Sequence, residues 1–340
     1  MHMADALLSP AVSGVLYAAS IAAVGVSIHR INRGQKGEEL GGKKLPLMAV
    51  SGAFVFAAQM INFTIPGTGS SGHIGGGILL AGLLGGGPAL LTIAAVLIIQ
   101  CLFFADGGLL ALGANIFNMG VIPCLVVYPL LFRPLLQKKL TLGRLSLATM
   151  LSCIVGLQLG AFGVVLETLA SGVTELPFGT FVLLMQPIHL AIGAVEGVIT
   201  AAVFAYVYRT RPELLQSSVQ GRAVGGGVSL RKTVATLAVL AVLVGGGLSL
   251  FASAYPDGLE WSMQKVTGST ELSREDTAHA AAAAAQEQTA ILPDYDFAAG
   301  QGTGTSVAGL VGAGLTFALA GGTGLALAAV KAKRKHKKNP

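Results

Sequence analysis

Long apolar stretches separated by short polar segments run through the whole 340-residue chain. Several reach the roughly 17–25 residues that a helix needs to cross a bilayer. The first begins at Ser9-Pro10, with serine as N-cap and proline in the first turn. We therefore expect an all-α integral membrane protein, in which a seven-helix bundle is followed by two further transmembrane helices. The predicted helices cover residues 10–29, 45–62, 74–84, 89–104, 113–132, 145–169, 181–208, 233–254 and 305–330.

The basic residues between these stretches set the expected orientation. They cluster at 30–44, 133–144, 209–232 and 331–340. If the N-terminus lies outside, every cluster falls on one side, as the positive-inside rule requires. We expect a multi-pass protein of the cell (inner) membrane, with an extracellular or periplasmic N-terminus and a cytoplasmic C-terminus.

The polar segment 209–232 divides the chain into a first part, residues 1–208, and a second part, residues 233–330. We interpret this segment as a cytoplasmic linker. The second part contains two predicted helices joined by an extracellular polar loop, about 255–303. We interpret the alanine-rich stretch of this loop as a solvated helix or a flexible spacer. The basic tail, 331–340, is expected to anchor the last helix at the cytoplasmic face of the lipid bilayer.

Composition excludes a soluble globular protein. Hydrophobic residues make up 53% of the chain and charged residues only 11%, against about 25% charged residues in globular chains. The net charge of +6 does not indicate nucleic acid, because the basic residues lie in short clusters between apolar stretches. No basic segment precedes the first apolar stretch, so we expect no cleaved signal peptide. Cys101, Cys124 and Cys153 lie inside apolar stretches, and we expect buried thiols there.

The first two residues carry the most specific candidate chemistry. A free amine on Met1, the backbone amide of His2 and the His2 imidazole can close fused chelate rings around one divalent ion. Such an arrangement is planar and suits nickel(II), copper(II) or low-spin cobalt(II) better than magnesium or calcium. It leaves one position open for a fourth nitrogen. The ordinary alternative is a frayed terminus without a ligand role.

His73 is the candidate for the fourth nitrogen. It lies in a glycine-rich loop on the predicted outer side and leads back into the membrane, although a lone loop histidine is often only solvated. Considered together, the two sites complete each other. The Met1-His2 chelate lacks a fourth ligand, and His73 alone lacks the other three. A metal-binding imidazole needs a partner that orients its other nitrogen, and the candidates are Asn62, Thr68, Ser70, Ser71, Asn115 and Asn118.

Other polar residues inside apolar stretches have a simpler interpretation. For Gln59, Gln100 and Gln158 we favour hydrogen bonds between helices over metal binding. His189 and Glu196 are seven residues apart and therefore share one helix face, two turns apart. An intramembrane carboxylate is a functional hypothesis by default, but pairing with another helix or docking of a partner subunit explains it as well, and we do not predict it as a metal ligand.

No catalytic motif is present: the chain lacks HExxH, GxSxG and a Walker A lysine. We therefore do not expect an enzyme, and any energy from ATP must come from another chain.

Several ordered motifs make residues 1–208 resemble the CbiM/NikM family, the substrate-binding membrane subunits of energy-coupling factor transporters for cobalt and nickel. They are the opening MHMADALLSP, the loop SSGHIGGG, the turn ADGGLLALGANIFNMG and the helical stretch HLAIGAVEGVITA. The resemblance implies a seven-helix bundle with the N-terminus folded into the extracellular face. It also implies that the Met1 amine, the His2 amide and imidazole, and His73 hold the metal.

The second part resembles the small companion subunit of nickel-type systems, NikN, because PDGLEW follows its first predicted helix. The resemblance implies capture of nickel(II) or cobalt(II), with nickel favoured, and coupling to a scaffold transmembrane protein and cytoplasmic ATPase subunits. The alternative is a metal-responsive membrane adaptor or sensor that binds the ion without transporting it.

Overall fold

The computed structural model describes residues 2–34, 44–221, 231–274, 276–297 and 304–338, with residues 331–338 as backbone only. Helices form nearly all of its regular structure. The exception is a small antiparallel hairpin in which Phe63 pairs with Gly72. The strands and the short helical turns are β1 (Phe63–Ile65), β2 (Ser70–Gly72), η1 (Asp5–Leu7), η3 (Leu248–Phe251) and η4 (Pro293–Tyr295).

The longer helices follow the predicted order. Six of them in the described residues are long and apolar enough to cross a membrane, so the prediction of an all-α membrane protein is confirmed. The helices are α1 (Pro10–Arg33), α2 (Lys44–Gln59), α3 (Gly77–Leu84), α4 (Gly86–Phe104), α5 (Leu112–Ile116), the π-helix η2 (Phe117–Phe132), α6 (Arg133–Gln137), α7 (Leu142–Ala170), α8 (Phe178–Thr210), α9 (Pro212–Gln220), α10 (Arg231–Gly246), α11 (Gly258–Thr267), α12 (Thr277–Thr289) and α13 (Gly304–Lys338).

The predicted starts and bounds of three helices can be compared with the structure. Ser9 caps α1 as expected, since its Oγ accepts from the Val12 amide at 3.3 Å. The helix expected from residue 74 begins only at Gly77, because Gly76 takes a left-handed conformation (φ 76°) that ends the extended loop before it. The helix expected over 113–132 is a short α-helix followed by a π-helix with two internal prolines, since proline removes backbone donors and widens a helix locally.

The centre of the molecule is α2, in which every residue from Leu47 to Ala57 is buried. Helices α4, α10 and α13 pack around it, so both parts of the chain contribute to its environment. On the other side, α7 and α8 pair along much of their length. The cysteines Cys101, Cys124 and Cys153 are buried and form no disulfide, as expected.

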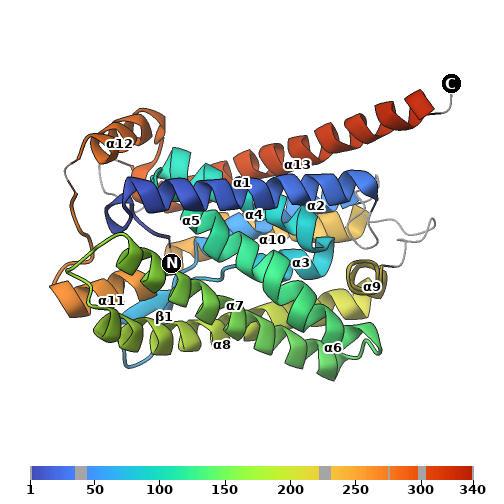
Figure 1. The fold of residues 1–340 in the computed structure, drawn as a ribbon. Coiled ribbons are helices and arrows are strands. Elements are labelled where there is room, and N and C mark those ends of the chain that lie inside the picture. The colour runs from blue at the N-terminus through green and yellow to red at the C-terminus, as the bar shows by residue number, and fades with distance from the viewer. Residues whose placement is uncertain (1, 35–43, 222–230, 275, 298–303, 339–340) are drawn as a thin grey trace.

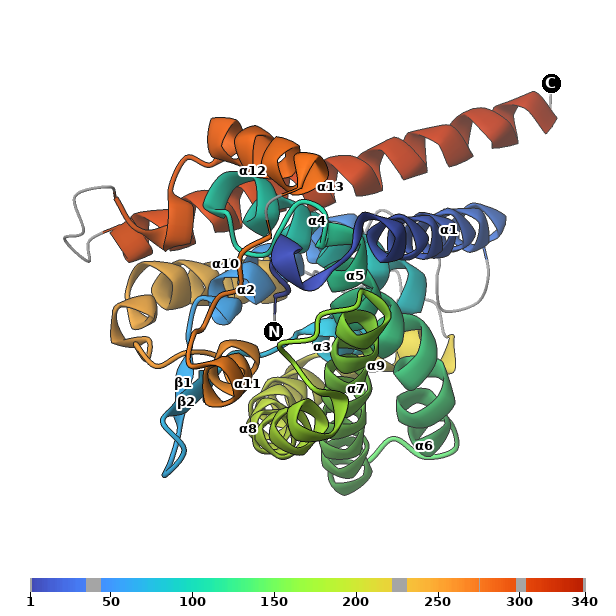
Figure 2. The same cartoon turned by 60° about the vertical axis from the view of Figure 1, so that its left-hand side comes forward.

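The two ends of the bundle differ. Figure 1 shows α11 and α12 at the end where the chain begins, and α6 and α9 at the opposite end. The turned view in Figure 2 shows the N-terminal segment entering among α2, α5 and α11. We call residues 2–8 the N-terminal segment. Its side chains Met3, Leu7 and Leu8 are at most 1% exposed, so burial of apolar surface holds it inside the bundle.

Candidate metal centre

The N-terminal segment is held by backbone contacts as well as by its apolar side chains. The Met3 amide donates to Oδ1 of Asn115 at 2.8 Å, and Nδ2 of Asn115 donates back to the Met3 carbonyl at 3.2 Å. The same carbonyl accepts from the Gly108 amide at 2.9 Å. The Asn115 side chain therefore bonds both backbone groups of Met3, as a neighbouring β-strand would, and fixes the position of the residue that follows His2.

Two further side chains extend this attachment. Nδ2 of Asn118 lies 4.0 Å from the Met3 sulfur and donates to Glu167 at 2.9 Å. Oδ1 of Asp5 accepts from the Ala111 amide at 3.0 Å. These contacts join the N-terminal segment to the bundle, so the position of residues 3–5 is set by the bundle.

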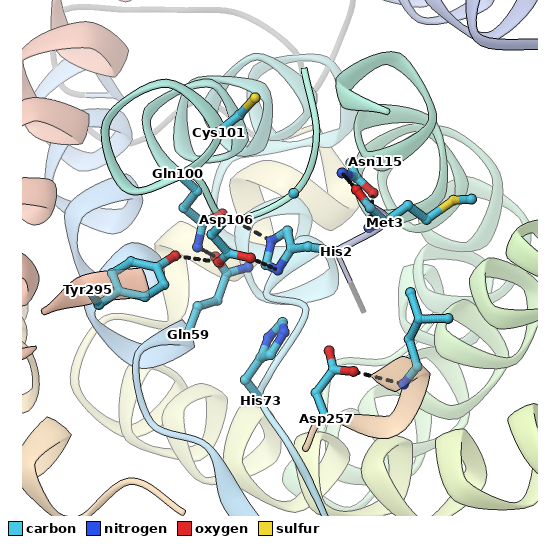
Figure 3. A network of polar contacts seen from close by, with 12 residues as sticks. His2, Met3, Gln59, His73, Gln100, Cys101, Asp106, Asn115, Asp257 and Tyr295 are labelled. Atoms are coloured by element: carbon cyan, nitrogen blue, oxygen red, sulfur yellow. Dashed lines mark hydrogen bonds and ion pairs between the residues drawn. The ribbon is translucent and has the colours of Figure 1, made fainter. Parts of the chain in front are cut away.

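The structure brings His2 and His73 together although they are 71 positions apart in the sequence. Their rings stack with centroids 5.1 Å apart and planes inclined by 17°, and Figure 3 shows the two imidazoles facing each other. Met1, the third predicted ligand residue, lies outside the described residues. The juxtaposition brings two imidazoles to the buried end of the N-terminal segment.

Each ring nitrogen of His2 has an acceptor beside it. Nδ1 lies 3.1 Å from Oδ1 of Asp106, and Nε2 lies 3.1 Å from Oε1 of Gln100. The orientation of the Gln100 amide is fixed, because its Nε2 donates to Gln59 at 2.9 Å. Both ring nitrogens of His2 therefore already have a polar contact. Binding of an ion to this ring requires exchange of one of these contacts.

The environment of Asp106 favours the ionised carboxylate. Burial alone would raise its pKa, but the charge and hydrogen bond of His2 and the hydroxyl of Tyr295 lower the pKa of Asp106 to about 2. Tyr295 belongs to η4 in the second part of the chain. The environment of His2 is thus shared between the two parts.

His73 has a different environment. Its Nδ1 lies 3.0 Å from the Ile74 carbonyl, so the neutral tautomer donates from Nδ1 and carries its lone pair on Nε2. Burial lowers the pKa of His73 to about 3. The ring is therefore neutral at ordinary pH, which is the form that coordinates metals.

The loop before His73 docks on the second part of the chain. The Ser71 amide and hydroxyl donate to the carbonyls of Pro256 and Tyr255, at 2.8 and 2.7 Å. The Ser70 hydroxyl also reaches the Pro256 carbonyl, at 3.4 Å. Ser70 and Ser71, two of the predicted orienting residues, thus serve this interface.

The remaining candidates have structural contacts too. The Thr68 hydroxyl donates to the Ile65 carbonyl at 2.8 Å, and its own carbonyl accepts from the Trp261 indole at 3.0 Å. The Asn62 carbonyl accepts from the Ser253 amide at 2.7 Å. The hydrogen bond that orients the His73 ring comes instead from the adjacent Ile74 carbonyl.

The PDGLE sequence forms the start of α11. Asp257 caps this helix by accepting from the Leu259 and Glu260 amides, and the Glu260 side chain accepts from the Asp257 amide. Figure 3 shows the Asp257 carboxylate beside His73. Burial would raise the pKa of Asp257, but nearby positive charge and the Glu260 amide hold it well below its ordinary value. A carboxylate therefore adjoins the histidine pair.

Helix α12 closes the same end of the molecule over the N-terminal segment. Nε2 of His279 lies 3.0 Å from the carbonyls of Asp5 and Leu8. Nε2 of Gln286 donates to the carbonyls of Cys101 and Gly107, at 2.9 and 2.8 Å. We call these contacts of α12 the clasp. It joins the second part of the chain to the segment that carries His2.

Sequence reasoning did not find Asp106, Asp257 or Tyr295 as neighbours of the histidines. One feature of the sequence pointed to Asp106: it is a carboxylate in a glycine-containing turn on the predicted outer side, where the metal site is expected. Gln59 and Gln100 do form the expected hydrogen bond between helices, and Gln100 additionally meets His2. Asp257 and Tyr295 lie in a segment whose position cannot be inferred from its own residues.

The fold and this site define a class: a helical membrane protein with a partly buried pair of histidines at one end of its bundle, one of them on an inserted N-terminal segment. The chain belongs to the CbiM family, the cobalt uptake substrate-specific transmembrane region, whose model matches residues 2–214. A second model, the PDGLE domain, matches residues 231–329. The resemblance inferred from the motifs is therefore confirmed.

Individual relatives agree with this assignment. The chain is 37% identical to a putative fused nickel transport protein NikMN of Archaeoglobus fulgidus, over 70% of this chain and 75% of that protein. It is 34% identical to a probable fused nickel transport protein LarMN of Lactiplantibacillus plantarum, over 78% and 79%. A crystal structure of a truncated transition metal transporter superposes with a TM-score of 0.53 at 32% identity, covering 62% of this chain and 99% of that one.

Proposed function

We propose that this chain is the substrate-capture membrane component of an ATP-driven energy-coupling factor transporter that imports nickel(II) or cobalt(II). The stacked pair of His2 and His73 carries this proposal. Two imidazoles meet at the end of an N-terminal segment that the bundle holds in place. Family membership supports transition-metal uptake as the setting.

The proposed site contains four nitrogens: the Met1 amine, the deprotonated His2 amide, the His2 imidazole and Nε2 of His73. The ion is the cargo and is bound only for transport. His73 already carries the lone pair on Nε2, whereas His2 must exchange its contact with Asp106 or Gln100, and its backbone amide must lose a proton. Binding therefore releases protons, and affinity should fall in acid.

Nickel is the favoured cargo within this proposal. The four-nitrogen set suits nickel(II) and low-spin cobalt(II) alike. The family description names cobalt, whereas the two relatives described above are named as fused nickel transport proteins and share the two-part organisation. We propose residues 1–208 as the metal-binding bundle and 233–330 as the companion that docks on it, joined by a cytoplasmic linker, 209–232.

Transport requires further subunits in this proposal. A scaffold transmembrane protein and cytoplasmic ATPases would supply the energy, and the N-terminus would face outward in the cell (inner) membrane. The basic clusters at 133–144 and 209–232 support that orientation. Uptake of nickel by cells with and without the ATPase subunits separates transport from a role as a metal-responsive adaptor, which would bind the ion without ATP-dependent uptake.

The test of the site compares purified protein with its native start and protein with one extra residue before Met1. The extra residue moves the α-amine and breaks the first chelate ring. We expect nickel and cobalt binding, measured by calorimetry and elemental analysis, to be lost in the extended protein. One extra residue at the C-terminus is the matched control and should leave binding unchanged. Equal binding by both proteins would contradict a site built on the amine.

A further inference from the structure

A partly open cavity of about 40 Å³ begins at His73 and extends along the inner face of α8. A water molecule needs roughly 10–15 Å³ in this measure, so the cavity has room for about three waters, or for an ion that keeps part of its hydration shell. Six of its lining residues carry polar or ionisable groups: His73, Asn118, Cys153, His189, Glu196 and Asp257. The cavity therefore connects the histidine pair with the middle of the bundle.

His189 presents a nitrogen to this cavity. The side chain is fully buried, and its Nδ1 lies 2.8 Å from the Met185 carbonyl in the preceding turn. Nδ1 therefore carries the proton of the neutral ring, and the lone pair is on Nε2. Nε2 has no hydrogen-bond partner among the described residues. A buried polar atom without a partner is costly, which indicates that this nitrogen serves a ligand.

The PDGLE turn closes the cavity over His189. A Cβ at Gly258 would lie 3.0 Å from Cε1 of His189 and 3.2 Å from its Nε2. Only glycine lets the backbone of the second part approach this closely. The turn therefore covers the histidine, and the adjacent Asp257 adds a carboxylate to the cavity wall.

Glu196 lies deeper along the same face. It follows His189 by two helical turns, about 10.5 Å along the axis, and is 3% exposed. Its Oε1 accepts from the Gly76 amide at 3.0 Å, which places the carboxylate at the start of α3. A charged group at this depth is costly to bury and marks an ion pathway in many membrane proteins.

We propose that this cavity is an inner station for the transported divalent cation, where Nε2 of His189 receives the ion from His73 and the Glu196 carboxylate draws it further into the bundle. The inference rests on the proposed function and adds a second site to it. Imidazole and carboxylate ligands suit nickel(II) and cobalt(II). The described residues contain no cluster of three His, Cys, Asp or Glu side chains around one point. The station is therefore weak and partly hydrated, as a transit site must be if the ion is to leave it.

The substitutions His189→Leu and Glu196→Gln test the station. Leucine removes the nitrogen, and glutamine keeps the acceptor for Gly76 but removes the charge. Leu190→Ala is the matched control, because Leu190 is the next residue on α8 and is 49% exposed. The full chain with its native start is used, with nickel as the probe, in cells that also express the other transporter subunits.

We call the proposed site at Met1, His2 and His73 the outer site. We expect each test variant to bind nickel there as the unmodified chain does, while nickel uptake falls by about tenfold or more. The control should bind and transport normally. Normal uptake by both test variants would overturn the station. Loss of outer-site binding in both would also overturn it, because His189 and Glu196 would then only support His2 and His73. Failure of the unmodified chain to bind or transport nickel would overturn the proposed function itself, and the station with it.

A second measurement examines the station without the outer site. In a chain with His2→Ala, we expect weak cobalt(II) binding, visible by absorption spectroscopy, that disappears when His189→Leu is added. Residual binding that survives His189→Leu would place the ion elsewhere and contradict the proposal.

Discussion

At the scale of single residues, the position of His2 depends on neighbours that hold its backbone. Asn115 pairs with Met3 as a strand would, and Asp106 and Gln100 hold the imidazole. The motifs sufficed to predict that His2 and His73 meet. They did not predict Asp106, Tyr295 or Asp257, because these contacts join residues about 100 to 190 positions apart and follow no periodic pattern.

Replacement of Asn115 tests this backbone attachment. Asn115→Leu keeps the volume but leaves the Met3 amide without its buried partner, at a cost of about 1–3 kcal/mol. We expect nickel affinity, measured by calorimetry, to fall by about 10–100-fold. Gln158→Leu is the control, because that amide donates to Gln186 between α7 and α8. An Asn115→Leu protein with unchanged affinity would show that the N-terminal segment is positioned without this pairing.

At the scale of elements, sequence patterns predicted which segments are helical better than how those helices begin and bend. The capped start of α1 is confirmed, since serine and proline act locally. The start of α3 and the π-helix η2 were missed, because a left-handed glycine and the accommodation of two internal prolines depend on tertiary packing. The predicted spans over 45–62 and 233–254 correspond to the 16-residue helices α2 and α10, so the number of crossings stays a prediction.

The clasp of α12 should respond to pH. Burial opposes the charged form of His279, but the Asp276 carboxylate, 2.8 Å from Nδ1, and the carbonyls of Asp5 and Leu8 raise its pKa above the ordinary value. Because the folded-state pKa is raised, the stabilisation is complete below about pH 6.5, the ordinary histidine pKa, and is lost as pH rises through the raised pKa.

We therefore expect hydrogen exchange of the α12 amides to accelerate, beyond its intrinsic pH dependence, as pH rises from about 6.5 through the raised pKa of His279. A His279→Gln protein should exchange faster at pH 6 and should lack this additional acceleration. Identical profiles for the two proteins would exclude His279 as the titrating group of the clasp. The amides of α7, which the clasp does not contact, provide the internal reference.

At the scale of the whole molecule, the two parts of the chain share one core. Helix α2 from the first part packs against α10 and α13 from the second, and α11 docks beside α8 and β2. The linker is thus not a boundary between independent bodies. Its residues 222–230 lie outside the described residues, so their conformation plays no part in this conclusion.

Co-expression of residues 1–221 and 231–340 as separate chains tests the shared core. We expect the two chains to co-purify in detergent, because separation would expose the faces of α2, α10 and α13 that now pack together. The control is an unrelated two-helix membrane protein expressed in place of the second chain. This protein should not co-purify with residues 1–221. Recovery of the two chains as separate species would mean that the packing requires covalent connection.

The insertion of the N-terminal segment also fixes an order of events during synthesis. Residues 2–8 are synthesised before their partners Asn115 and His279, which follow more than 100 and more than 270 positions later. The N-terminal segment must therefore wait for these later residues before its contacts are complete. A chain that ends before α12 lacks the clasp over its N-terminal segment. The site can therefore be complete only after α12 has been synthesised.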